Sequence, residues 1–136
     1  MSLMEIEQID GVPIAHVNED IDASNAAATR QQLADALGPD ALRLIVDLSD
    51  TRYIDSAGID MLLRLSDRLD HRRARLILVI PETSQLKRLV TIVGMPEAIA
   101  IHPTLAEALR EAARARGQED APAPASPSLD QTGRAR

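Results

Sequence analysis

A short polar sequence, Asp55-Ser56-Ala57-Gly58, places an acid and a hydroxyl next to two very small residues. It follows an apolar run, LRLIVDL at residues 42–48, and leads into the amphipathic stretch GIDMLLRLSDRL. A serine in this setting can act as a nucleophile, cap the start of a helix, or accept a modifying group. Each function needs different neighbours, which the rest of the sequence either provides or lacks.

Nucleophilic catalysis by Ser56 requires a base, usually a histidine, to take the hydroxyl proton. The three histidines, His16, His71 and His102, fall in an expected strand, loop and strand end, outside any recognisable catalytic pattern. The Gly-x-Ser-x-Gly elbow of hydrolases is absent, because Ile54 stands at the position of its first glycine. No set of histidines and carboxylates has the spacing of metal ligands, so we expect no metal site and no cofactor. The sequence therefore predicts a protein that is not an enzyme.

Capping and modification are the two remaining interpretations of Ser56. Asp and Ser both cap helices well, because their side-chain oxygens accept the backbone N–H groups that lack partners in the first turn. Capping does not explain Gly58, since glycine costs about 1 kcal/mol of helix propensity relative to alanine. A phosphate would use an open helix start, where free N–H groups and the helix dipole favour negative charge. Ala57 and Gly58 would leave a phosphoryl group on Ser56 accessible.

Strand and helix patterns alternate along the chain. Asp10-Gly11 predicts a hairpin over residues 5–17. Further strands are expected at residues 42–48, 74–80 and 98–102, and helices at residues 26–37, from residue 56, at 82–94 and at 103–116. Ser24 or Asn25 would cap the first of these helices. This order indicates an α/β fold, a small mixed and mostly parallel β-sheet with about four α-helices packed on it.

The composition limits the classes of partner. The 136 residues carry a net charge of -6, which opposes a nonspecific hold on nucleic acid or on an anionic membrane. One Tyr, with no Phe or Trp, argues against base stacking. No apolar run approaches the roughly 20 residues of a membrane helix, and no signal peptide is recognisable. The absence of cysteine is compatible with the cytoplasm, where we expect the protein to be. Residues 4–116 would form one domain and residues 117–136, rich in Ala-Pro, a disordered C-terminal tail.

The segment LRLIVDLSDTRYIDSAGIDMLL resembles the hallmark of the STAS family, the anti-sigma factor antagonists. In that family a buried strand ending in Asp-Leu leads by a short turn into Asp-Ser-x-Gly at the start of a helix. DIDASNAAATRQQLADAL is similar to the loop and first helix of the family, and RLILVIPETSQLKRLVTIVGM to a later strand and helix. The resemblance covers roughly residues 5–116 and implies the STAS-type fold.

What the resemblance implies is a switch protein. The serine after the Asp would be phosphorylated by an anti-sigma factor that is itself a serine kinase. The unphosphorylated form would bind that kinase and free the sigma factor, and the phosphorylated form would release it. By position the phosphorylation site is Ser56. The residues expected to contact the partner are Asp22, Ser24, Asn25, Asp55, Ala57, Gly58 and Met61.

Two departures from the family pattern and two other roles accompany this interpretation. Glu19 stands where the family often has glycine, and Ala57 where many members carry a second hydroxyl. The alternative roles are the STAS subunit of an ABC-type phospholipid transport complex and a stressosome-type scaffold. Direct nucleic-acid binding and membrane insertion are not expected, whereas weak homodimerisation is compatible with the resemblance.

Met61 is included among the expected partner contacts because of its position on the helix that begins at Ser56. At 100° per residue, the expected core face carries Ile59, Leu62, Leu63, Ser66 and Leu69. Met61 falls nearly opposite this face. It would then be either an ordinary surface methionine or an adaptable contact for the partner.

Overall fold

The computed structural model describes the backbone of residues 4–120 and the side chains as far as residue 114. It opens with a hairpin of β1 (Met4–Ile9) and β2 (Val12–Val17), paired antiparallel from Met4↔Val17 to Ile9↔Val12. Asp10 and Gly11 both have positive φ, 51° and 80°, as a two-residue type I′ turn requires. The hairpin expected from Asp10-Gly11 is confirmed.

A single five-stranded sheet runs in the order β1-β2-β3-β4-β5, with every pair after the hairpin parallel. The other strands are β3 (Arg43–Asp47), β4 (Arg75–Val79) and β5 (Ala100–His102). The helices are α1 (Ala26–Leu37), α2 (Ser56–His71), α3 (Gln85–Ile92), the short 3₁₀ turn η1 (Met95–Glu97) and α4 (Leu105–Asp120). The expected mixed, mostly parallel α/β fold with four α-helices is confirmed.

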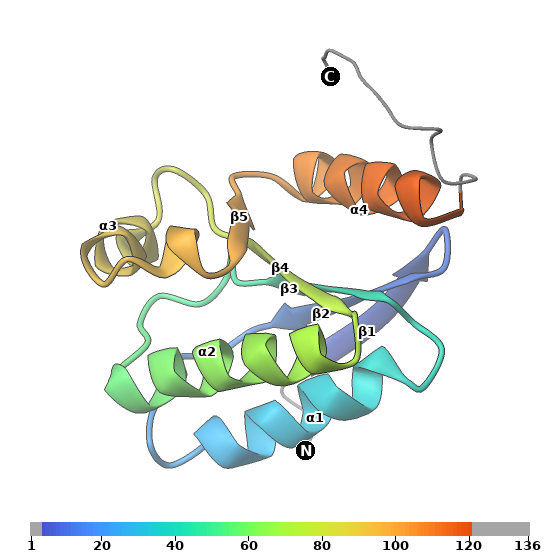
Figure 1. Cartoon of the computed structure of the whole chain (residues 1–136). Coiled ribbons are helices and arrows are strands. Elements are labelled where there is room, and N and C mark those ends of the chain that lie inside the picture. The colour runs from blue at the N-terminus through green and yellow to red at the C-terminus, as the bar shows by residue number, and fades with distance from the viewer. Residues whose placement is uncertain (1–3, 121–136) are drawn as a thin grey trace.

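Helices cover both faces of the sheet, α1 and α2 on one side and α4 on the other (Figure 1). Alternate residues of each central strand point to opposite faces, so Ile45 lies in the core beneath α4 whereas Leu44 and Val46 lie in the larger core beneath α1 and α2. Ala108 and Ala112 bring α4 close to the sheet. Apolar residues on both faces explain why residues 42–48 and 74–80 read as continuous apolar runs.

The end of α4 differs from the expectation. α4 continues through Gly117 to Asp120, so the expected helix end at Gly117 is wrong. Glycine weakens a helix by about 1 kcal/mol but does not terminate it without a following residue or packing that favours a turn. The remainder of the expected tail lies outside the described residues. Within residues 4–120, no helix is both long and apolar enough to cross a membrane.

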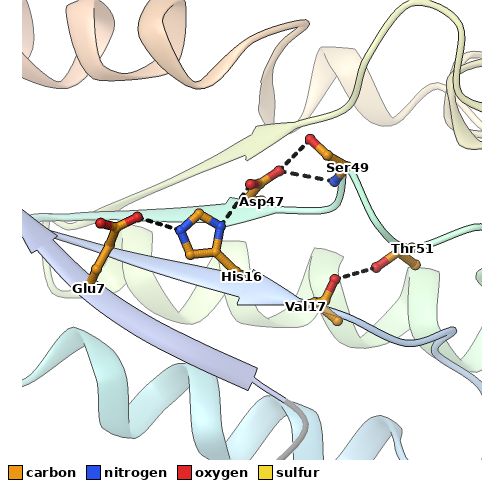
Figure 2. A network of polar contacts seen from close by, with 6 residues as sticks. All are labelled: Glu7, His16, Val17, Asp47, Ser49 and Thr51. Atoms are coloured by element: carbon orange, nitrogen blue, oxygen red, sulfur yellow. Dashed lines mark hydrogen bonds and ion pairs between the residues drawn. The ribbon is translucent and has the colours of Figure 1, made fainter.

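A polar network fastens the hairpin to the loop that leads toward Ser56 (Figure 2). His16 of β2 lies between two carboxylates, its Nδ1 2.8 Å from Asp47 Oδ2 and its Nε2 2.6 Å from Glu7 Oε1. Asp47 in turn accepts hydrogen bonds from Ser49, from the backbone N–H at 3.0 Å and from the hydroxyl at 2.6 Å. Burial lowers the pKa of His16, but the hydrogen bonds and charges of Glu7 and Asp47 outweigh it and raise this pKa above 6.5. The imidazole thus joins β1, β2 and β3 at the end of the sheet from which the loop departs.

Candidate functional site

Ser56 is the first residue of α2, and its side chain is exposed. The cap is the preceding residue: Asp55 has extended backbone, and its Oδ1 accepts a hydrogen bond from the Gly58 N–H at 3.0 Å. Within the described part of the chain, the Ser56 hydroxyl makes no hydrogen bond. Of the two residues that could cap α2, only Asp55 does so. The Ser56 hydroxyl is left available to solvent and to a modifying group.

Two loops meet at the start of α2. Ile21 and Ile54 form an isolated parallel bridge, in which the Ile21 N–H donates to Tyr53 O at 3.0 Å and the Asp55 N–H donates to Ile21 O at 3.1 Å. Asp20 Oδ1 accepts from the backbone N–H groups of residues 52 and 53, both at 3.0 Å. The second carboxylate oxygen of Asp55 accepts from the Ala23 N–H at 3.2 Å. The loop before α1 is therefore held against the loop before α2 by backbone and carboxylate bonds.

The loop before α1 is folded by its own short polar side chains. Asp22 Oδ1 accepts hydrogen bonds from the Ser24 N–H at 2.9 Å and the Ser24 hydroxyl at 2.5 Å. These bonds from Ser24 lower the pKa of Asp22, which keeps its negative charge near neutral pH. Asn25 Oδ1 accepts from the Asp22 N–H at 2.9 Å, and its Nδ2 donates to Asp20 O at 2.8 Å. Asn25 stands at the N-cap position of α1 without bonding the helix, so neither residue proposed as its side-chain cap acts as one.

Gly58 has a packing role that the sequence did not show. It is buried, and a Cβ atom built on it would lie 2.5 Å from Ile54 Cγ2 and 2.9 Å from Ile21 Cγ2. The two bridging isoleucines therefore cover the position that we expected to lie open to a phosphate. That expectation is wrong: Gly58 is needed because the bridge packs directly on the first turn of α2.

Met61 lies in the core, with 5% of its surface exposed, and it cannot form a surface contact in this structure. The buried residues of α2 are Gly58, Met61, Leu62, Leu65, Ser66 and Leu69, while Ile59 and Leu63 are half-buried. Leu65 borders a groove shared with α1, and Met61, four residues earlier, lies on the same side of the helix. The expected core face allowed only for the sheet, whereas α1 buries a second side of α2.

Five of the seven residues expected to contact a partner gather around Ser56. Asp22, Ser24 and Asn25 come from one loop, and Asp55 and Ala57 from the other, while Gly58 lies beneath them and Met61 in the core. Sequence reasoning missed Asp20, Ile21 and Tyr53. Tyr53 is the single aromatic residue of the chain and is 56% exposed beside the bridge. An exposed aromatic residue beside a polar motif is a signal that could have indicated a contact surface.

The groups around Ser56 act in opposite ways on a negative group placed there. The N–H groups at the start of α2 have no intrahelical acceptors and favour a negative group, while the carboxylates of Asp55 and Asp22 lie close by and would repel one. Among the side chains of residues 4–114, no three histidines or carboxylates are arranged to hold a metal ion.

Comparisons with known proteins agree with this geometry. The anti-sigma-F factor antagonist RsfB of Mycobacterium tuberculosis is 23% identical over 100 residues, which make up 74% of this chain and 80% of RsfB. The crystal structure of an anti-sigma factor antagonist from Mycobacterium paratuberculosis superposes with a TM-score of 0.72 at 24% identity, covering 81% of this chain and 92% of that one. The Bacillus cell fate determinant SpoIIAA in its phosphorylated form superposes with a TM-score of 0.59 at 16% identity, covering 79% and 97%. The family model described as the STAS domain matches residues 4–108. Because that match spans most of the chain, the protein belongs to the STAS domain family.

Proposed function

We propose that this protein is an anti-sigma factor antagonist, a binding protein that is switched by phosphorylation of Ser56. The observation that carries the proposal is the exposed Ser56 hydroxyl, which makes no hydrogen bond to the described side chains and backbone, at a helix start that Asp55 caps. The similarity to RsfB and to phosphorylated SpoIIAA supports the same role. The partner would be a cytoplasmic anti-sigma factor that is also the serine kinase acting on this site.

The switch would act through charge. Phosphorylation adds about -1.5 to -2 charges at neutral pH. Asp55 and the ionised Asp22 already lie beside this position, and no arginine or lysine occurs in the first turn of α2 to pair with a phosphate. An unpaired charge buried at an interface costs roughly 2–5 kcal/mol, and about 1.4 kcal/mol corresponds to a tenfold change in affinity. Phosphorylation should therefore weaken binding by roughly thirty-fold to several-thousand-fold.

The test is titration calorimetry of the cognate anti-sigma factor against unmodified protein, enzymatically phosphorylated protein and two variants. Ser56→Ala should bind as tightly as wild type and accept no phosphate. Ser49→Ala removes another exposed serine of the same loop and serves as the matched control, which should still be phosphorylated by the kinase. Equal affinities of the phosphorylated and unmodified proteins would refute the switch. Such constitutive binding is what a transport subunit or a stressosome scaffold would show.

A further inference from the structure

A groove between α1 and α2 collects arginine side chains away from Ser56. It has a volume of about 390 Å³ and is lined by Arg30, Arg68 and Arg72 around three leucines, one glutamine and one alanine, with no carboxylate among its lining residues. A neighbouring hollow adds Arg64 and a single acid, Asp67. The chain as a whole carries a net charge of -6, whereas the side chains that line this groove are positively charged or neutral.

Stabilisation of the domain explains only part of this arrangement. Arg72 donates to the carbonyls of Gly38 and Pro39 at 2.8 and 3.0 Å, and Arg64 pairs with Asp60 at 2.7 Å. Arg68 in the last turn of α2 also favours the helix dipole. Arg30 lies beyond the first turn of α1, where the helix dipole has little effect, and it borders both hollows. Among the side chains of residues 4–114, neither Arg30 nor Arg68 forms an ion pair with a carboxylate. Both line the same two hollows, so their positive charges are gathered in one place, where an anionic partner would be favoured.

We infer that this groove is a second docking surface for an acidic helical segment of the same anti-sigma factor. The inference rests on the proposed function. Arg64 and Arg68 of α2 and Arg72, which caps its C-terminus, are spaced at i, i+4 and i+8, about 6 Å apart along the helix axis. A partner helix with carboxylates at the same spacing would match them. The leucines beneath the arginines, Leu37, Leu65 and Leu69, are almost fully buried, so the groove offers little apolar surface for a small molecule.

The distance to Ser56 allows one partner to contact both places. Arg64 and Arg72 lie about 12 and 24 Å along α2 from Ser56, at a rise of 1.5 Å per residue. A typical interface covers about 800 Å² on each protein, which is roughly 30 Å across. Contacts in the groove would then accelerate association and orient the partner, while Ser56 controls release.

The test compares two variants that change the net charge equally. Arg30→Glu/Arg68→Glu reverses the groove, and Arg110→Glu/Arg114→Glu reverses two exposed arginines of α4 on the opposite face of the sheet. Stopped-flow association with the cognate anti-sigma factor at low salt should be at least tenfold slower for the groove variant and change less than threefold for the control. The difference should shrink at high salt. The milder Arg30→Gln/Arg68→Gln variant gives a smaller effect of the same sign, and circular dichroism verifies that each variant is folded.

Each outcome of this test separates the groove from the switch. Equal slowing of the groove and control variants would mean that net charge alone acts, and would overturn the groove assignment while the Ser56 switch stands. Failure of wild type to bind the anti-sigma factor would overturn both. Titration with inorganic phosphate and with vesicles containing anionic lipid completes the test. Binding of either probe that is lost in the groove variant, with protein association unchanged, would reassign the groove to a small anion or a membrane.

Discussion

Substitution of Gly58 tests the packing that places Ser56. A Cβ atom at this position would lie 2.5 Å from Ile54 Cγ2 and 2.9 Å from Ile21 Cγ2, both well inside normal contact. These two atoms belong to the bridge that joins the loops, and they are surrounded by core residues that leave little room to retreat. Gly58→Ala should therefore destabilise the domain, although alanine is the better helix former.

The magnitude follows from two opposing contributions. Overpacking a well-packed core costs typically 1–3 kcal/mol, and replacing glycine by alanine in a helix returns up to about 1 kcal/mol. The 2.5 Å approach to Ile54 Cγ2 places the overpacking cost in the upper part of that range, about 2–3 kcal/mol. We therefore expect the free energy of unfolding to fall by about 1–2 kcal/mol for Gly58→Ala, and by about 3 kcal/mol or more for Gly58→Val, whose side chain is larger. Loss of kinase activity toward Gly58→Val would then follow from a disturbed fold instead of a blocked approach.

Urea unfolding of a double-mutant cycle makes the measurement specific. Ile54→Leu removes the Cγ2 branch nearest to Gly58 at nearly constant volume and alone should cost less than about 1.5 kcal/mol. In that background Gly58→Ala should cost less than in wild type, with a coupling of at least about 0.5 kcal/mol. A Gly58→Ala protein as stable as wild type, or a coupling near zero, would refute the packing explanation. The earlier interpretation, that Gly58 keeps Ser56 accessible to a phosphoryl group, would then stand again.

Two further predictions concern the cap and the histidine network. Asp55→Ala should lower the free energy of unfolding by about 0.5–2 kcal/mol, and Ser56→Ala by less than about 0.5 kcal/mol because its side chain is exposed and unbonded; equal losses in urea unfolding would contradict the assignment of the cap. The raised pKa of His16 means that its stabilising contribution is fully present below pH 6.5 and lost as the pH rises through the higher folded-state pKa. Urea unfolding from pH 5.5 to 8.5 should show this loss in wild type and not in His16→Gln, and identical pH profiles would exclude the network as its source.

The elements that the sequence predicted are those encoded by neighbouring residues. Asp10-Gly11 specifies its turn by the positive φ that both residues tolerate, and the apolar runs of β3 and β4 specify strands covered on both faces. The position of Ser56 at the start of a helix was likewise predicted from neighbouring residues. What the motif could not show was which of two adjacent capping residues turns toward the helix. The choice depends on the Ala23 N–H, which binds the second oxygen of Asp55 from a residue 32 positions away.

The failures at Gly58 and Met61 have a common physical origin. Met61 was interpreted from a helical projection and Gly58 from its small size beside Ser56, and neither argument contains information about other elements that pack on α2. Gly58 is covered by Ile21, and the side of α2 that carries Met61 is covered by α1, which are both distant in sequence. Neither contact has a sequence signature, since an isoleucine in a loop and the packing side of a neighbouring helix carry no motif.

The division of tasks between Asp55 and Ser56 bears on how such a switch can work. If the modified serine were itself the cap, phosphorylation would replace the bond that holds the first turn, and the charge change would come with partial loss of the helix start. Here Asp55 provides both the cap and the bond to the opposite loop. A phosphoryl group on Ser56 would instead lie at the first helical position, where free N–H groups favour it. The geometry therefore allows the surface charge to change while the two loops stay joined, so a partner would be released by electrostatic repulsion and steric bulk with the fold left intact.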